Sequence, residues 1–225
     1  MVVAREAYKT QLAELGETIA KLGEKTLKSI RQSGEMLANS DMGLAEDIIA
    51  RRRDIDRLRR TVEDSCMSLM LLQQPMASDM RFVTSAFRSV SDLGRIAEMA
   101  LDIAELEDEM DTESVEAVGS RLRDLSEKSA DMVETALSAF VSSDADVAEQ
   151  VFEMDNGVDE AFLALRATIV DELRSDEEDV SARTAPELLM IAKYYERIGD
   201  HAQSVADWAI FRATGTYRGH QLGQA

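Results

Sequence analysis

The stretch RIAEMALDIAE at Arg95–Glu105 recurs as RIGDHAQSVAD at Arg197–Asp207, an offset of 102 positions from 95 to 197. Most positions in the two copies are identical or similar in size and charge, and both have apolar residues at helical spacing. Self-similarity over such a distance indicates a duplicated structural unit. The chain is therefore predicted to consist of two related helical halves, each ending in one copy of this stretch.

Turn-forming residues are sparse, and they divide the chain into six segments with the apolar periodicity of helices. We expect these helices to end near residues 38, 72, 107, 141, 173 and 213, with a polar loop at 174–179 before the last helix. Asp41, Asp111 and Asp144 stand at three boundaries, where a short polar side chain can accept hydrogen bonds from the free amides of the next helix. Pro75 closes the second helix because proline disfavours helix at the residue before it.

The fold class predicted from these segments is all-α. Short connections make neighbouring helices antiparallel, so each half is expected to be a three-helix bundle. The duplication predicts an approximate two-fold relation between the two bundles. We expect the first bundle at residues 1–110, the second at 111–213 and a flexible, Gly-containing tail at 214–225.

The composition supports helix and excludes several partners. Hydrophobic residues make up 45% of the 225 residues and only two are proline, which favours helix in nearly every window. Asp and Glu number 44 against 25 Lys and Arg, a formal net charge of −19. Such a chain repels polyanions, so nucleic acid is not an expected partner.

The same charge gives no general attraction to anionic lipid, and no apolar run of transmembrane length exists. The first residues lack the basic, apolar and small-residue regions of an export signal, so a cytoplasmic location without direct membrane insertion is expected. Cys66, the single cysteine, excludes an internal disulfide. Its apolar neighbours Val62, Leu69 and Met70 predict a buried side chain.

Two pairs of acidic residues are candidates for metal binding. Asp155 and Asp159 are four apart on the predicted fifth helix, and Glu196 and Asp200 are four apart on the sixth, so each pair shares a helix face. Antiparallel packing brings such pairs together, and carboxylate oxygens suit hard cations. The alternative is ordinary solvated acids, because a chain this acidic contains such pairs by chance.

The first half departs from this pattern. The repeat places Gly94 opposite Glu196 and Glu98 opposite Asp200, and a shift of one residue places Arg52 opposite Asp155 and Asp56 opposite Asp159. A first-half site is therefore expected to be weaker or absent. Candidate contributors to the two sites are Asp56, Glu98, Asp102 and His201, of which Asp102 lies one turn beyond Glu98 and His201 lies beside Asp200.

Catalysis is not expected from this sequence. Neither His201 nor His220 has a Glu three residues before it, which disfavours a di-iron oxidase, and no phosphate-binding loop or nucleophile elbow is present. The second helix carries a basic stretch with six arginines between residues 51 and 60. It either docks an acidic partner or pairs with acids on its own and adjacent helices.

Three stretches resemble the PhoU family. They are Gln73–Arg81 (QQPMASDMR), Tyr195–Ala202 (YERIGDHA) and Phe211–Gly215 (FRATG), and the likeness runs from the first helix to about Arg218. The resemblance implies two three-helix bundles with metal clusters held by Glu/Asp-x-x-x-Asp motifs. Glu196 and Asp200 match that motif and Asp155 and Asp159 match the neighbouring pair, whereas Gly94 and Arg52 do not match.

The resemblance also implies a function. Family members act with the Pst phosphate ABC transporter, through its ATPase subunit, and with the PhoR-type sensor histidine kinase. The expected role is a negative regulator of phosphate uptake and of the phosphate-starvation response that binds a divalent or trivalent metal (Mg, Mn, Fe or Zn) and is not an enzyme. A homodimer is compatible with this role. The alternative is a carboxylate-rich metal-handling or metal-dependent helical-bundle enzyme.

Overall fold

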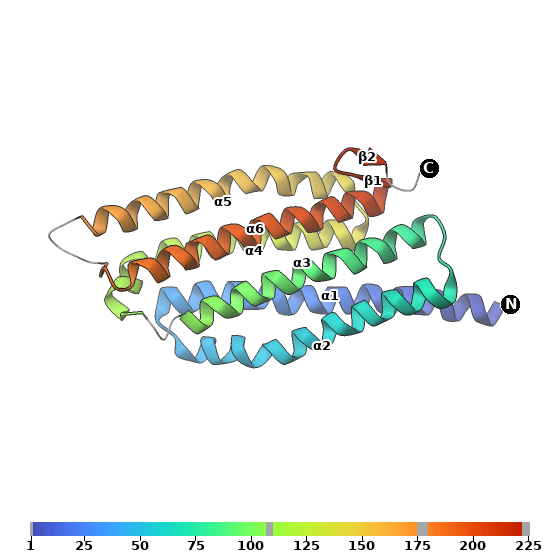
Figure 1. Cartoon of the computed structure of the whole chain (residues 1–225), viewed down its shortest axis with the longest axis horizontal. Coiled ribbons are helices and arrows are strands. Elements are labelled where there is room, and N and C mark those ends of the chain that lie inside the picture. Colours follow the sequence, from blue (N-terminus) through green and yellow to red (C-terminus); the bar gives the residue numbers. More distant parts are fainter. Residues whose placement is uncertain (1, 107–109, 175–179, 222–225) are drawn as a thin grey trace.

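Six helices make up most of the computed structural model, which describes residues 2–106, 110–174 and 180–221 (Figure 1). They are α1 (Val2–Asn39), α2 (Met42–Gln73), α3 (Ser78–Leu106), α4 (Thr112–Ser142), α5 (Ala145–Glu172) and α6 (Ala185–Thr214). The all-α prediction is confirmed. Residue 107, where α3 was expected to end, and most of the expected loop at 174–179 lie outside the described residues. Within those ranges, no helix combines the length and apolarity needed to cross a bilayer.

Three aspartates begin helices as their positions in the sequence predict. The Oδ1 atoms of Asp41 and Asp144 accept hydrogen bonds of 3.0 Å from the backbone N–H groups two residues on. Oδ1 of Asp111 accepts one of 2.9 Å from the backbone N–H of Ser114. Each bond satisfies a donor that the first turn of a helix leaves free, so the helix starts are encoded locally.

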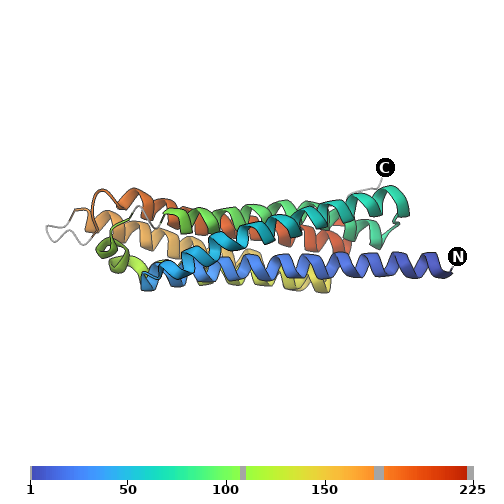
Figure 2. The same cartoon turned by 90° about the horizontal axis from the view of Figure 1, so that it is seen from below.

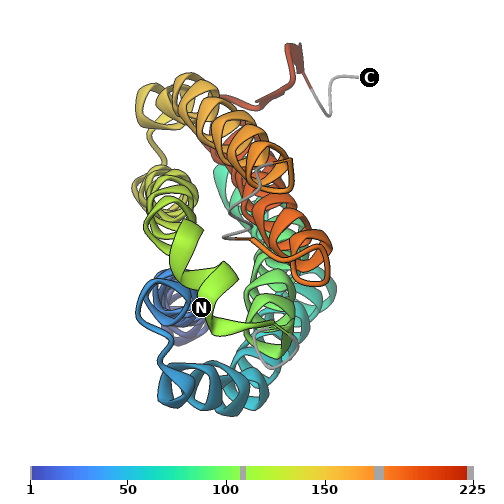
Figure 3. The ribbon, with the colours of Figure 1, turned by 90° about the vertical axis from the view of Figure 1, so that its left-hand side faces the viewer.

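Each half is an antiparallel set of three helices, α1 to α3 and α4 to α6 (Figures 1 and 2). Between the halves, α1 packs on α4 and α3 packs on α6. Figure 3, which looks along the bundle, shows α2 and α5 at opposite ends of the cross-section. Equivalent helices therefore meet each other, as an approximate two-fold relation requires. A boundary between the bundles at residues 110 and 111 stays a prediction.

The two halves share one continuous apolar core, to which all six helices contribute. At its centre, Tyr195 of α6 has no exposed surface. Its hydroxyl lies 2.8 Å from Ser33 Oγ of α1, and its carbonyl accepts a 2.9 Å hydrogen bond from Ser129 Oγ of α4. Cys66 is fully buried, as predicted. The halves are thus joined by buried polar side chains that form hydrogen bonds with each other.

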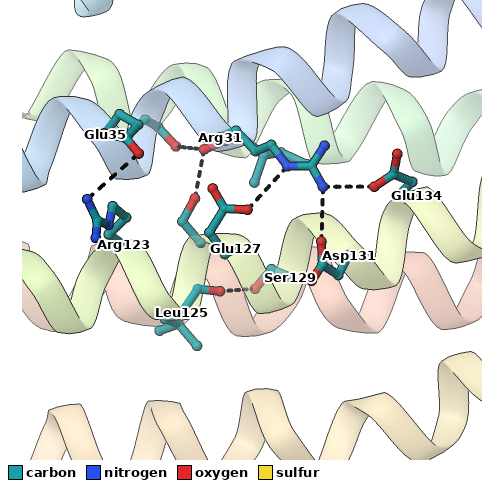
Figure 4. Close-up of polar contacts among 11 residues, drawn as sticks. Arg31, Glu35, Arg123, Leu125, Glu127, Ser129, Asp131 and Glu134 are labelled. Carbon is teal, nitrogen blue, oxygen red and sulfur yellow. Dashed lines mark hydrogen bonds and ion pairs between the residues drawn. The ribbon is translucent and has the colours of Figure 1, made fainter.

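An arginine at the surface also joins α1 to α4 (Figure 4). Arg31 donates Nε to Glu127 at 3.2 Å and Nη2 to Asp131 at 2.9 Å and to Glu134 at 2.8 Å. The hydrogen bond with Glu134 is the largest of the contributions that raise the pKa of Arg31 above its ordinary value. One guanidinium therefore offsets the mutual repulsion of three carboxylates on the exposed side of α4.

The end of the chain differs from the expected loose tail. After α6, Gly215 adopts a left-handed conformation (φ 83°), and β1 (Thr216–Tyr217) pairs antiparallel with β2 (His220–Gln221). The ring of Tyr217 stacks on Trp208 of α6 with centroids 4.2 Å apart, and Arg218 Nε donates to Asp207 Oδ2 at 2.7 Å. The described part of the tail folds back because α6 supplies both an aromatic and an acidic partner.

Candidate metal centre

The four acids of the second half lie near one another, on adjoining helices. Asp155 and Asp159 are one turn apart on α5, and Glu196 and Asp200 are one turn apart on α6, which packs against α5. Burial raises the pKa of the Asp155 carboxyl, and the negative charges of Asp159, Asp200 and Glu196 raise it further. The structure thus brings the two predicted pairs into one electrostatic cluster.

Asp155 of α5 lies close to the backbone of α6. A Cβ atom built on Gly199 would lie 3.7 Å from Asp155 Oδ1, so the carboxylate reaches the helix between Glu196 and Asp200 in sequence. A hydrogen bond from Gln203, one turn further along α6, partly offsets the raised pKa of Asp155. This spacing is ordinary van der Waals contact, so the Asp155 carboxylate packs against α6 beside the predicted pair Glu196 and Asp200.

Only one cation contacts the cluster among the described residues. Lys193 Nζ lies 2.5 Å from Glu196 Oε2 and 5.4 Å from the centroid of the Phe162 ring. Within the described part of the chain, Asp155, Asp159 and Asp200 form no ion pair. The cluster therefore retains negative charge that a bound cation can neutralise.

The donor type fits a hard cation, but the side chains do not form a coordination sphere as they stand. In the described residues, no three His, Cys, Asp or Glu side chains converge in a way that could hold a metal ion. Carboxylates at the surface can change rotamer at small cost, and those of α5 and α6 already face a common region. Metal binding by Asp155, Asp159, Glu196 and Asp200 thus stays a prediction.

The equivalent region of the first half is built differently. Gly94 of α3 stands where α6 has Glu196, and the side chain of Arg59 from α2 lies directly over it. A Cβ atom at position 94 would lie 2.7 Å from Arg59 Nη1 and 2.8 Å from its Cδ, closer than real Cβ contacts. The guanidinium therefore occupies the space that an acidic side chain at position 94 would need.

Arginines also pair with two acids of the first half, Glu98 and Glu63. Glu98 lies 3.4 Å from Arg59 Nη1 and 2.7 Å from Arg95 Nη1, and Glu63 Oε1 lies 3.9 Å from Arg59 Nε. Asp56 and Arg52 line a small cavity of about 40 Å³ together with Gly94 and Glu98. In the first half the predicted candidates Asp56 and Glu98 thus share their surroundings with guanidinium groups.

Asp102 lies at the contact between the halves. Burial raises its pKa, as do the charges of Glu105 and Glu98, while a hydrogen bond from Tyr194 of α6 and the charge of Arg52 lower it. The same contact raises the pKa of Tyr194, mainly through burial and then through the charge of Asp102. Asp102 therefore links α3 to α6, and it also lies close enough to Glu98 to be affected by its charge.

His201 contacts α3. Its Nδ1 lies 2.9 Å from Asp92 Oδ1, and Ser204 Oγ donates to the other Asp92 oxygen, also at 2.9 Å. In this conformation the ring nitrogen nearest the backbone is engaged by Asp92 and is not directed to a site with Asp200. The sequence does not identify Asp92 as a partner, because only the packing of α3 on α6 places residues 109 positions apart in contact.

Arg59 was not identified from the sequence as a residue of the first-half site, although the repeat alignment could have indicated it. The offset of 103 that aligns α2 with α5 places Arg59 opposite Phe162. The first half therefore gains a cation in the same region in which it loses the acid at position 94. The gain of a positive charge at position 59 and the loss of a negative charge at position 94 together indicate that the first half has exchanged an acidic residue for a basic one.

Comparison with known proteins agrees with the duplicated architecture. The sequence profile described as "PhoU domain" matches twice, at residues 19–106 and 122–209. Among the similar curated proteins is the phosphate-specific transport system accessory protein PhoU homolog 2 of Mycobacterium tuberculosis, 29% identical, which covers 95% of this chain and 99% of that protein. The PhoU homolog 1 of Methanothermobacter thermautotrophicus is 30% identical, over 93% of this chain and 95% of its own.

Solved structures show the same fold. The crystal structure of PhoU from Pseudomonas aeruginosa superposes with a TM-score of 0.81 at 27% identity, covering 93% of this chain and all of that one. That of the phosphate transport system regulatory protein PhoU from Streptococcus pneumoniae has a TM-score of 0.82 at 25% identity, covering 93% of this chain and 98% of that one. With both halves matched by the PhoU domain and the six helices superposing on these structures, the chain belongs to the PhoU family.

Proposed function

We propose that this protein is an accessory protein of phosphate transport that restrains phosphate uptake and the phosphate-starvation response when phosphate is plentiful. The observation that carries the proposal is the PhoU domain matched in both halves, together with relatives named as accessory proteins of the phosphate-specific transport system. The proposal gives the protein a cytoplasmic location, with contact to the membrane only through the transporter.

The proposed mechanism is binding. A long body with one continuous core presents extended helical faces on which the ATPase subunit of a Pst-type transporter and a PhoR-type sensor kinase can dock, from a monomer or a homodimer. The described residues give little support to catalysis. Ser204 donates to Asp92 and not to His201, so this Ser, Asp and His set lacks the nucleophile-to-base hydrogen bond of a hydrolase.

We further propose that Asp155, Asp159, Glu196 and Asp200 hold a divalent or trivalent metal ion (Mg, Mn, Fe or Zn). Two observations support this site. The four carboxylates lie close together, and among the described residues Asp155, Asp159 and Asp200 form no ion pair. A bound cation supplies positive charge that structures this surface for a partner. The identity of the ion follows from availability, because carboxylate sites accept several ions.

The test uses cells grown in high phosphate. Affinity-tagged protein is recovered after crosslinking, and the transporter ATPase and sensor kinase are quantified by mass spectrometry. Either protein is expected to be enriched at least tenfold over an untagged strain. Deletion of the gene is expected to derepress phosphate-starvation genes in the same medium. Full repression after deletion, with neither partner recovered, would sink the regulatory role.

The second candidate is a metal-handling or metal-dependent helical-bundle enzyme, which the carboxylate cluster of the second half favours. Metal analysis of the purified protein and its Asp159→Asn/Asp200→Asn variant separates the two. If the protein is a regulator, it should bind metal at one cluster per chain and should also bind the transporter. Storage or chemistry predicts many ions per chain, or turnover that disappears with these two carboxylates.

A further inference from the structure

We infer that the guanidinium of Arg59 takes, in the first half, the place of the metal cation proposed for the second half, so that the protein binds metal in one half only. The inference rests on the proposed metal site of α5 and α6. It adds that the two-fold related region between α2 and α3 holds a cation belonging to the chain itself.

The position of Arg59 is the first argument. Its Cδ and Nη1 would lie 2.8 Å and 2.7 Å from a Cβ at Gly94, which is the position equivalent to Glu196. No side chain larger than that of glycine fits at position 94 unless Arg59 moves. The long side chain of α2 thus fills the volume in which the second half presents a carboxylate.

The charges provide the second argument. Arg59 contacts Glu98 at 3.4 Å and Glu63 at 3.9 Å, and Arg95 contacts Glu98 at 2.7 Å. Burial and the charges of Glu105 and Glu98 raise the pKa of Asp102, and the charge of Arg52, at the position equivalent to Asp155, partly offsets this rise. A metal ion here would have to displace guanidinium groups from the remaining carboxylates and lie beside several positive charges, which opposes its binding.

The second half carries different residues at three of the equivalent positions. Phe162 replaces Arg59, Glu196 replaces Gly94 and Asp155 replaces Arg52. The cation there, Lys193, contacts only Glu196, from one turn away on the same helix, and half of its side chain is exposed. Cation binding in the second half therefore relieves repulsion, whereas in the first half that relief is already built in.

Matched pairs of substitutions separate the halves. We would load the wild type with Mn²⁺, remove free ion by gel filtration and measure manganese per chain by mass spectrometry, with circular dichroism as the folding control. Asp56→Asn/Glu98→Gln is expected to leave the manganese content unchanged. Asp159→Asn/Asp200→Asn, which removes the same number of carboxylates, is expected to lower it at least tenfold. A loss of manganese caused by Asp56→Asn/Glu98→Gln would overturn the inference.

A converted protein tests Arg59 independently of the second-half site. The triple change Arg52→Asp/Arg59→Phe/Gly94→Glu gives the first half the residues of the second, and it is expected to roughly double the bound manganese. If the wild type holds no manganese, the second-half site fails. The role of Arg59 then stands only if the converted, folded protein gains manganese, and it fails if the metal content stays at the wild-type level.

Discussion

The hydroxyl of Tyr195 on α6 lies 2.8 Å from Oγ of Ser33 on α1, with both side chains fully buried between the two halves. Ser33 Oγ also donates to the carbonyl of Ile30 at 2.6 Å, so it accepts from the tyrosine. The pair is a buried polar contact that links the two halves within the core. Displacing either side chain has a cost, since a buried hydroxyl moved from its partner loses a hydrogen bond that water cannot replace.

Removing this hydrogen bond is expected to lower the free energy of unfolding. Tyr195→Phe and Ser33→Ala should each cost about 1 kcal/mol, and the double variant should cost less than their sum because both remove the same bond. Urea denaturation followed by circular dichroism measures all three. Tyr217→Phe, which removes a partly exposed hydroxyl away from this contact, serves as the control with a change below about 0.5 kcal/mol. Strict additivity would show that the two hydroxyls are not coupled.

Asp111 is expected to stabilise the second half in a pH-dependent way. Its Oδ2 accepts from Ser181 at 2.6 Å and from Thr184, while Oδ1 caps α4, and the hydroxyl bonds hold the pKa of Asp111 well below its ordinary value of 3.8. The stabilisation by this carboxylate is complete above pH 3.8 and is lost as the pH falls through the lower folded-state pKa.

Asp111→Ala should therefore cost about 1 kcal/mol at pH 7, and this deficit should shrink as the pH is lowered from 4 towards 2. Urea midpoints of the variant and wild type at several pH values measure the difference. Asp144→Ala removes a cap confined to its own helix and gives the cost of a cap alone at pH 7. A deficit that stays constant down to the lowest pH would contradict the role of the charge.

The contact between Gly94 and Arg59 predicts that the effect of Gly94→Ala on stability depends on whether Arg59 is present. Alanine favours helix over glycine by roughly 0.5 to 1 kcal/mol. In the wild type, Gly94→Ala should yield less of this gain, because Arg59 must move away from position 94 and loosen its contact with Glu98. In an Arg59→Ala background the gain should appear. Gly157→Ala on α5, where a Cβ would meet nothing within 4 Å, should stabilise both backgrounds equally.

Chemical denaturation of these variants completes the comparison. Equal effects of Gly94→Ala with and without Arg59 would mean that the arginine does not rest on position 94 in solution.

The hairpin after α6 should be visible in the fluorescence of Trp208, the single tryptophan. Trp208 is 6% exposed and is covered by Tyr217, with Arg88 5.2 Å from its ring centroid. Tyr217→Ala is expected to shift the emission to longer wavelength and to increase acrylamide quenching several-fold. Tyr217→Phe keeps the stacked ring and should leave both unchanged. An unaltered spectrum for Tyr217→Ala would place the hairpin away from α6.

Local signals in the sequence predicted the helices and their ends. Asp41 and Asp144 cap helices whose starts depend on a few neighbouring residues, and Cys66 is buried because the apolar periodicity around it is helical. The duplication predicted which helices correspond. These features depend on contacts within one or two helical turns, which is the range over which spacing and propensity act.

Contacts between distant residues were decided by the tertiary structure. The meeting of Asp92 with His201, the folding of Tyr217 onto Trp208 and the position of Arg59 over Gly94 all depend on the depth and register at which helices pack. A shift of one residue along a helix turns a side chain by about 100°, so spacing within one helix does not specify its neighbour on another. The sequence by itself determined six helices and two related halves, and packing decided which charges in each half meet a partner.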